Sequence, residues 1–486
     1  MLNRRQFMSR VAAAPLAAAA IQTASGIATA ANGAKPNVLF IAVDDLRPEL
    51  NCYGRTWIHS PNIDRLAKMG MAFERAYCQQ AVCSPSRSSL MTGTRPDSTK
   101  VWDLVTHFRA AEPNIVTVPE HFKKNGYFVQ GMGKIFHPGY DDPRSWSVPW
   151  QTPEAPTYAK GKSANEVDED KPKAKGGPPV ESADVPDNFY KDGKVADIAV
   201  ATLKVIAKKP EPFFLAVGFA KPHLPFVSPK KYWDLYDPAK IQLAPNPYHP
   251  EDAPEWALTN SNEVRNYQGM PTKGKFDDTI ARQLKHGYYA AVSYTDAQIG
   301  KVLDELDRQG LTKNTIVILW GDHGWKLGEH GEWAKHSNVE NDTNAPLLLA
   351  APGMKAANKH CKALVEFVDI FPTLSELAGL PLPTHLEGWS FKRLLDNPEL
   401  PWKPAAFSQY PRGKDRMGYS MRTDRYRFTV WVGREDHSRI DAIELYDHQA
   451  DPQENTNISK RPANAELVKQ LMAQWQAGWK AASPPA

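Results

Sequence analysis

Four long apolar segments place the strongest constraint on the fold of this chain. They are rich in β-branched and aromatic residues, lack an alternating polar pattern and end in polar or turn residues, and they cover residues 36–45, 212–223, 314–324 and 345–353. Continuous apolar strands of this kind are typical of a parallel sheet whose two faces are covered by helices. The segments therefore predict a buried parallel sheet.

Helical patterns separate these strands. Between the second and third strands, side chains recur at helical spacing on one face, at Tyr288, Ala291, Thr295, Ile299, Val302 and Leu306. Shorter helices are predicted within residues 64–70 and 118–127, each closed by a glycine after basic residues. Strands that alternate with helices indicate a doubly wound α/β sheet, and 486 residues suffice for one large domain with a smaller companion.

The pattern changes near residue 381. Residues 417–432 alternate in polarity on either side of the turn sequence TDRY, which predicts an antiparallel hairpin, and residues 464–480 predict a closing helix. We therefore expect a large domain over residues 32–380 and a smaller carboxy-terminal subdomain over residues 381–486.

Two further segments are predicted to lie outside these elements. Residues 160–187 are rich in Lys, Glu, Gly and Pro and lack periodicity, which indicates a solvated insertion loop. Residues 1–31 contain Arg4, Arg5 and Phe7 before an alanine-rich run, and they resemble a twin-arginine export signal. This signal predicts a bacterial protein that the twin-arginine machinery exports to the periplasm, the cell surface or the medium.

Charge, hydropathy and cysteine content argue against other classes of protein. The formal net charge of +4 is small and no basic stripe is interleaved with aromatic residues, so we expect no nucleic-acid partner. No run after the signal approaches the length of a membrane-spanning helix. Four cysteines are too few for a disulfide scaffold, although a bond between Cys52 and Cys78 stays open.

Acidic residues follow two of the predicted strands. Asp44 and Asp45 end one strand, and Asp322 and His323 end another. Ligands of open α/β sheets bind beyond the carboxyl ends of the strands, and adjacent carboxylates repel each other unless a cation neutralises them. Three carboxylates and one imidazole favour a hard divalent ion such as Ca²⁺, whereas turn formation or helix capping is the structural alternative.

The segment CSPSR, residues 83–87, is predicted to begin a helix with Pro85 in its first turn. Cys83 would then face the free amides and the positive end of the helix dipole, which together form an anion site. Arg87, four positions on, would share that face and could donate two hydrogen bonds to an oxyanion. An unmodified Cys83 could be a thiolate nucleophile or an inert buried thiol.

CSPSR also matches the C-x-P-x-R signature of type I sulfatases, in which the cysteine is converted to formylglycine. The chain is similar to the iduronate-type branch of that family over most of its length. The similar stretches are LMTGTRPDST (90–99), GKIFHPG (133–139), AKPHLPF (220–226), GDHGWKLGEHGEWAKHSN (321–338), SQYPR (408–412) and MGYSMRTDRYRFTVWVG (417–433). An ordered set of this length makes coincidence improbable.

This resemblance implies an alkaline-phosphatase-like fold, in which helices flank a large, mostly parallel sheet and a smaller antiparallel sheet lies in the carboxy-terminal subdomain. It implies one Ca²⁺ held by Asp44, Asp45, Asp322, His323 and the modified Cys83. Hydrated formylglycine at Cys83 would be the nucleophile, and a formylglycine-generating enzyme would be a partner in maturation. The other catalytic residues implied are Arg87, Lys134, His137, His223 and Lys335.

The resemblance also implies the hydrolysis of sulfate esters on a uronate-containing poly- or oligosaccharide. Arg412, Lys414 and Arg416 are candidates to pair with a uronate carboxylate, and Trp325 is a candidate to stack on a sugar face. Three alternatives remain open. They are a phosphonate or phosphate monoester hydrolase of the same superfamily, an inactive glycan-binding homologue and a hydrolase that uses the Cys83 thiolate.

Overall fold

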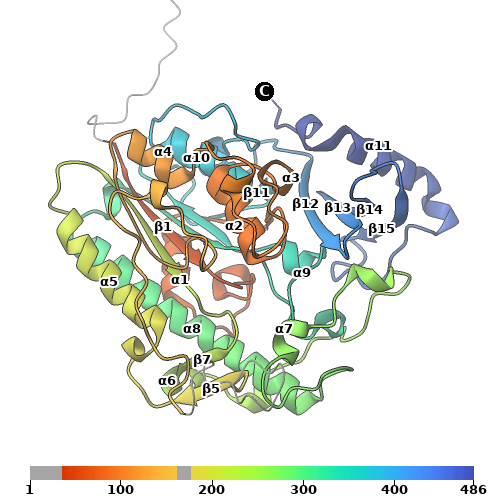
Figure 1. The fold of residues 1–486 in the computed structure, drawn as a ribbon, viewed down its shortest axis with the longest axis horizontal. Helices are drawn as coiled ribbons and strands as arrows, with labels where there is room; N and C mark the ends of the chain where they lie inside the picture. The colour runs from red at the N-terminus through yellow and green to blue at the C-terminus, as the bar shows by residue number, and fades with distance from the viewer. Residues whose placement is uncertain (1–34, 161–176, 486) are drawn as a thin grey trace, which may run out of the picture. The chain divides into compact units, whose positions relative to one another are not determined.

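A central seven-stranded sheet organises the protein (Figure 1). The computed structural model describes residues 35–160 and 177–485, which belong to one compact unit, and the predicted export signal at residues 1–31 lies outside them. The strand order is β10-β2-β9-β8-β1-β6-β4. The strands are β1 (Asn37–Val43), β2 (Met71–Phe73), β4 (Phe128–Gly133), β6 (Phe213–Phe219), β8 (Thr315–Gly321), β9 (Leu347–Ala350) and β10 (Lys359–Cys361).

The core of this sheet is parallel, as the apolar segments predict. Strand β1 pairs in parallel with β6 on one side and β8 on the other, and β4 pairs in parallel with β6. The fourth predicted strand is present as β9, but it runs antiparallel to β8 and β2, contrary to the expectation. Residues 322–346 stay at the carboxyl edge of β8 and contain no crossover helix, so the chain re-enters the sheet from that edge.

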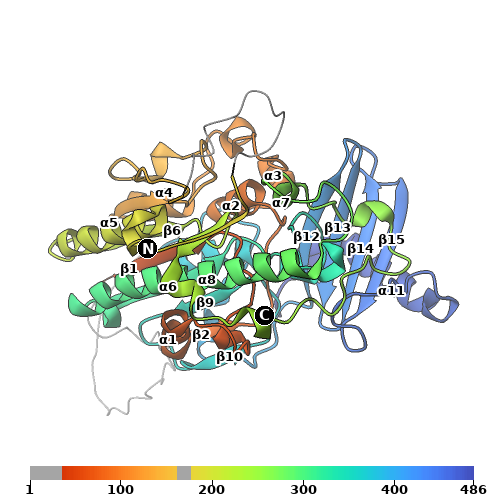
Figure 2. The same ribbon diagram turned by 90° about the horizontal axis from the view of Figure 1, so that it is seen from below.

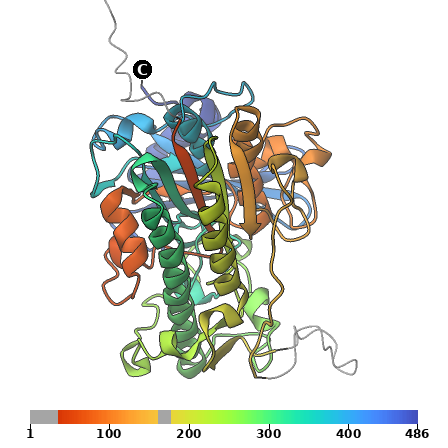
Figure 3. The same cartoon turned by 90° about the vertical axis from the view of Figure 1, so that its left-hand side faces the viewer.

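Helices cover both faces of the sheet. Helices α1 (Pro61–Met69), α5 (Lys191–Ile206) and α8 (Asp278–Arg308) pack on one face, where α5 and α8 run side by side (Figure 3). Helices α2 (Cys83–Thr92), α4 (Val118–Lys124) and α10 (Ile370–Leu377) pack on the other. Leu39, Ile41 and Val43 of β1 face the first group and Val38 and Phe40 the second, because strand side chains alternate. The doubly wound prediction is confirmed.

A smaller antiparallel sheet forms the carboxy-terminal part (Figure 2). Its strands, in order, are β12 (Ala405–Arg412), β13 (Arg416–Thr423), β14 (Tyr426–Gly433) and β15 (Ile440–Asp447), and helix α11 (Ala465–Ala481) packs against them. The predicted hairpin and closing helix are confirmed. Because residues 35–486 form one compact unit, the predicted boundary near residue 380 stays a prediction.

The predicted insertion loop is only partly a loop. Residues 161–176 lie outside the described residues, whereas β5 (Val180–Ala183) pairs in parallel with β7 (Phe226–Pro229). The loop prediction is therefore wrong at its carboxyl end, because a strand this short gives no clear periodicity. The remaining short elements are β3 (Ala76–Tyr77), α3 (Pro96–Thr99), α6 (Lys230–Trp233), α7 (Asn262–Arg265), α9 (Glu340–Thr343) and β11 (Val365–Glu366).

The structure also bears on the cysteines and on membrane-spanning helices. All four cysteines are free, so Cys52 and Cys78 form no bond. Within residues 35–160 and 177–485, no helix combines the length and apolar character that a membrane crossing requires.

Candidate active site

The two strand-end pairs predicted as metal ligands meet at one edge of the large sheet. Strands β1 and β8 are neighbours with Val43 opposite Gly321, so Asp44 and Asp45 arrive beside Asp322 and His323. The backbone N–H of Asp45 donates to Oδ1 of Asp322 at 3.0 Å. All four side chains are fully buried.

Cys83 completes this cluster from the first turn of α2, where the sequence places a helix start. Its Sγ lies 3.4 Å from Oδ1 of Asp44 and 3.5 Å from Nε2 of His323. One ligand atom from each of Asp44, Cys83, Asp322 and His323 lies within 4.8 Å of the others, and a second such group joins Asp44, Asp45 and Cys83 to His223. The carboxylate oxygens fit a hard cation, whereas the unmodified sulfur and the imidazole nitrogens are softer donors.

Two lysines balance part of the charge of this acid cluster. The ammonium of Lys134, which follows β4, contacts Asp44, and Nζ of Lys335 lies 2.9 Å from Oδ1 of Asp45. Burial alone would raise the pKa of Asp44, but Lys134, His223 and Arg87 hold it well below its usual range. Burial nevertheless raises the pKa of Asp45. Burial thus disfavours the charged form of Asp45, which a cation bound beside it would favour.

The Arg87 guanidinium holds the metal-ligand candidates in place. Nε donates to Oδ2 of Asp322 at 2.9 Å, and Nη2 donates to Oδ1 of Asp44 at 3.2 Å. Nη1 donates to the carbonyl oxygens of Lys134 and Ile135 at 2.6 and 3.0 Å. All three guanidinium nitrogens thus have protein acceptors, and the catalytic role predicted for Arg87 stays a prediction.

Two predicted catalytic histidines lie in loops that follow β4 and β6. His223 stands in a turn with cis peptide bonds before Pro222 and Pro225, and its Nε2 lies 4.0 Å from Oδ2 of Asp45. Burial and the nearby Lys134 ammonium lower the pKa of His137 to about 4. At neutral pH, His137 is therefore an uncharged imidazole that can accept a proton.

Glu263 belongs to this site, although the sequence analysis did not find it. Its carboxylate lies 3.1 Å from both Nε2 of His223 and Nζ of Lys335. Burial would raise its pKa, but Lys335 and His223 hold it well below its usual range. Glu263 lies on the four-residue helix α7 within an irregular stretch, so no periodicity or motif singles it out.

The predicted sugar contact of Trp325 is wrong. Its indole is fully buried in the core, where Phe226 packs against one edge and Lys335 lies 4.9 Å from the ring centroid. A ring enclosed in this way has no free face for a sugar. Sequence alone gave no measure of its exposure.

The three basic residues predicted to bind a uronate carboxylate differ in whether other groups of the protein already bind their side chains. Arg412 donates to three backbone carbonyls outside its own strand, of Trp256, Ala257 and His336, and to the carbonyl of the adjacent Pro411, so its guanidinium supports loops next to Lys335. Arg416 pairs with Asp441 at 2.7 Å. Lys414 is exposed, and within the described residues no ion pair engages it. Uronate recognition by this group stays a prediction that rests mainly on Lys414.

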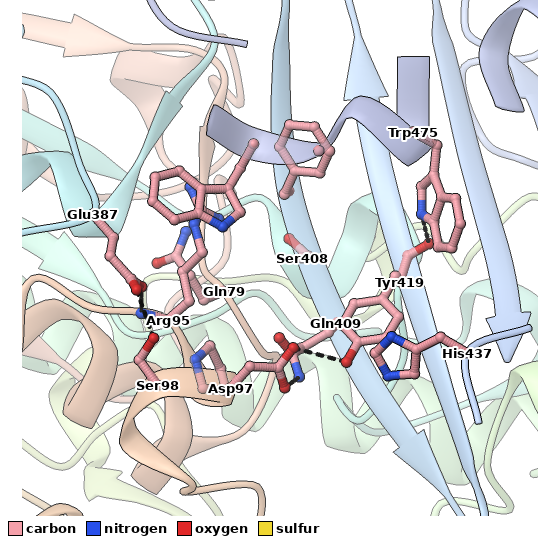
Figure 4. A pocket seen from close by; sticks show the side chains of 14 residues that line it. Gln79, Arg95, Asp97, Ser98, Glu387, Ser408, Gln409, Tyr419, His437 and Trp475 are labelled. Atoms are coloured by element: carbon pink, nitrogen blue, oxygen red, sulfur yellow. Dashed lines mark hydrogen bonds between the residues drawn. The ribbon is translucent and has the colours of Figure 1, made fainter. Parts of the chain in front are cut away.

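A separate hollow of about 230 Å³ lies between α3, β12, β13 and α11 (Figure 4). The hydroxyl of Tyr419 donates to Asp97 at 2.7 Å, and the indole of Trp475 donates to the Tyr419 carbonyl. Of the described residues that line it, none is a predicted site residue. This hollow is therefore not part of the candidate active site.

The fold, the strand-end cluster and the similarity to known proteins together define a hydrolase of sulfuric esters. A sequence model of the Sulfatase family matches residues 36–380, and a model named N-sulphoglucosamine sulphohydrolase, C-terminal, matches residues 328–480. The chain belongs to the sulfatase family. Its predicted place in the iduronate-type branch is also confirmed, because the iduronate 2-sulfatase of Mus musculus is 38% identical over 512 residues, covering 90% of this chain and 93% of that protein.

Other relatives extend the similarity. A sulfatase of Formosa agariphila is 34% identical over 469 residues, covering 92% of this chain and 88% of its own. A solved structure described as a complex with its substrate D-glucosamine-2-N,6-O-disulfate superposes with a TM-score of 0.73 at 22% identity, covering 93% of this chain and 99% of that one. The phosphonate monoester hydrolase of Agrobacterium radiobacter superposes with a TM-score of 0.75 at 20% identity, covering 92% and 96%. The two structures support the fold alone.

Proposed function

We propose that this sulfatase hydrolyses sulfate esters on a uronate-containing poly- or oligosaccharide, with formylglycine at residue 83 and one Ca²⁺ ion. The relatives named iduronate 2-sulfatase support a sulfated uronate as substrate. The observation that carries the proposal is the position of Cys83, on the first turn of α2 and within 3.5 Å of two candidate metal ligands.

The surroundings of Cys83 disfavour the thiolate alternative. Burial and the carboxylate of Asp44 raise the pKa of the Cys83 thiol well above its usual value, although Lys134 and Lys335 act in the opposite direction. A nucleophilic cysteine needs a lowered pKa. Converted to formylglycine, residue 83 instead supplies a hydrated aldehyde with two hydroxyl groups, one to attack sulfur and one to expel sulfate afterwards.

The chain's other residues divide the remaining work. Asp44, Asp45, Asp322 and His323 would hold Ca²⁺, which supplies positive charge beside the sulfate group. Lys134, whose Nζ lies 3.8 Å from Sγ of Cys83, and Lys335 donate hydrogen bonds to the charged sulfate oxygens.

Proton transfer falls to the two histidines. His137 is neutral because of its lowered pKa, and it accepts a proton from the nucleophile side. His223, paired with Glu263 at 3.1 Å, donates a hydrogen bond or a proton to the departing alcohol oxygen. The Glu263 carboxylate holds the imidazole in place through this contact.

The biosynthetic setting belongs to the same proposal. A formylglycine-generating enzyme modifies Cys83, the twin-arginine machinery exports the chain by residues 1–31, and the enzyme acts in the bacterial periplasm, at the cell surface or outside the cell. The two arginines and the alanine-rich run support this route.

The first test is mass spectrometry of protein from its native host. Cleavage after Arg75 and Arg87 releases a peptide, residues 76–87, that contains both Cys78 and Cys83. We expect an aldehyde or its hydrate at position 83 and an intact thiol at position 78, which serves as an internal control. An unmodified thiol at both positions in active protein would contradict the proposal.

The second test is substrate choice. Sulfated disaccharides with and without a uronate should be compared with a phosphate monoester of the same alcohol, using the Cys83→Ala variant as the inactive control. We expect the sulfated uronate to have the highest kcat/KM. Faster turnover of the phosphate ester would favour the monoester hydrolase alternative, and no turnover of any ester by formylglycine-containing protein would favour a glycan-binding homologue.

A further inference from the structure

A second large cavity lies on the α8 side of the molecule. It has a volume of about 720 Å³ and is lined by parts of residues 47–59, 235–245 and α8, with Glu329 and a few residues from 340 onward. Of the described residues that line it, none belongs to the predicted catalytic set. The cavity is therefore separate from the strand-end cluster.

The carboxylates in the wall of this cavity already have cationic partners. Glu329 binds both terminal nitrogens of Arg47, at 2.9 and 3.1 Å, and Glu49 lies 3.2 Å from Nε of the same guanidinium. Asp237 lies 3.7 Å from Nζ of Lys240. The fourth carboxylate of the wall, Glu340, is bound by two arginines of the small sheet. The negative charges of these four carboxylates are therefore balanced by cations of the protein.

Two cations in the same wall have no acid partner. Lys285 of α8 is only 7% exposed, and within the described residues its ammonium has no hydrogen-bond or ion-pair partner. Its Nζ lies 5.9 Å from the centroid of the Tyr289 ring, and Glu329 and Glu49 act on its charge without forming an ion pair with it. Arg55 at the surface is likewise unpaired with any acid in the described part of the chain. The Lys285 ammonium borders the cavity without a hydrogen-bond partner among the described residues, so an anion in the cavity would stabilise its charge.

Aromatic rings stand next to these cations. Trp57 is 49% exposed, and the Arg55 guanidinium lies 5.7 Å from its ring. Tyr236 and Tyr289 line the interior, with ring centroids 5.5 Å apart. Pockets that combine apolar rings with a few well-placed charges are typical of small organic ligands. An inorganic ion alone would not use the apolar faces of these rings.

We propose that this cavity binds a small organic anion, with one carboxylate or sulfonate-type group held by Lys285 and Arg55 and a ring-shaped body packed on Trp57, Tyr236 and Tyr289. The volume accommodates one ring of monosaccharide size. This proposal stands independently of the function proposed for Cys83, because it uses none of the same residues.

Calorimetric titration of the full-length protein tests the proposal. The probes are D-glucuronate for a carboxylate on a sugar ring, p-toluenesulfonate for a sulfonate on an aromatic ring, and uncharged D-glucose. We expect saturable binding of at least one anion and none of glucose. The preferred anion tells whether the cavity selects a sugar or an aromatic body. The proposal is overturned if neither anion binds at about 10 mM, which is about tenfold above the 1 mM Kd of a weakly bound ligand.

Variants locate the binding site. Lys285→Met should raise Kd at least tenfold, whereas Lys285→Arg should change it less than threefold because the charge is kept. Lys240→Met is the matched control, since that lysine lines the same cavity but already pairs with Asp237. Unchanged anion binding by a folded Lys285→Met variant would contradict the assignment. Loss of binding only in Lys335→Met would also contradict it, because the anion would then occupy the catalytic cluster.

A chemical readout at Lys285 itself gives a second measure that needs no variant. Amine acetylation followed by peptide mass spectrometry should show slower modification of Lys285 with saturating anion, by at least fivefold, and an unchanged rate at the exposed Lys355. Equal rates with and without an anion that binds in the titration would overturn the proposal.

Discussion

The ammonium of Lys335 lies 2.9 and 3.1 Å from the two carboxylate oxygens of Asp45, and both side chains are almost completely buried. Replacing Lys335 by Met therefore removes a donor from the sulfate pocket and leaves the Asp45 charge without its nearest partner. We expect kcat/KM for an aryl sulfate to fall about 10²–10³-fold. The exposed Lys355→Met variant is the control, and a loss below tenfold in a folded Lys335→Met protein would exclude Lys335 from the reaction.

Chelation should destabilise the protein. Three fully buried carboxylates, Asp44, Asp45 and Asp322, converge at the strand ends, and a bound cation offsets their repulsion. A cation present at 100 times its Kd adds about 2.7 kcal/mol to the free energy of unfolding. We expect EGTA to lower Tm and Ca²⁺ to restore it. An identical Tm with and without EGTA would show that the lysines alone neutralise the cluster.

Glu263 should matter for turnover more than for substrate binding. In Glu263→Gln, His223 and Lys335 lose their shared carboxylate, so both side chains are less firmly positioned beside the leaving alcohol. We expect kcat to fall about tenfold, with a smaller change in KM. This loss in kcat is less than the about 10²–10⁴-fold effect of a general acid or base, because Glu263 acts through His223. The nearby exposed Glu255→Gln variant is the control, and a change confined to KM would contradict the role.

Acid should destabilise the folded state partly through His336. Burial and the adjacent Lys335 charge lower its pKa to about 3, whereas an unfolded histidine titrates near 6.5. The stabilisation is fully present above pH 6.5 and is lost as the pH falls towards 3, because only the unfolded chain then binds the proton. The free energies of urea unfolding at pH 6.5 and 5.5 should differ by about 1 kcal/mol from this residue. His336→Gln should reduce that difference, and His437→Gln, an exposed site, should not.

The sequence predicted best what depends on neighbouring strands. Asp44 and Asp322 follow apolar strands, and parallel neighbours end at the same edge, so their meeting followed from local pattern. The start of α2 at Cys83 followed from Pro85 in the first turn. Lys134, His137, His223 and Lys335 were found by resemblance only, because each stands in a loop whose path no periodicity records.

Other features depend on tertiary contacts that no local pattern contains. Glu263 reaches the site from an irregular segment, and Trp325 is enclosed by Phe226 and Lys335, so its burial was not readable from its position after β8. The antiparallel direction of β9 was missed for a related reason. An apolar run of four residues records burial but not direction.

The three carbonyls held by Arg412 have a consequence for the biosynthesis of this enzyme. The loop that carries Lys335 and the segment around Trp256 are both tied to the last residue of β12, which is synthesised about 75 residues after Lys335. A nascent chain that has emerged only as far as the large sheet can bury its strands but lacks this tie. The loops beside Lys335 therefore gain this tie only after β12 has been synthesised, long after the strands of the large sheet.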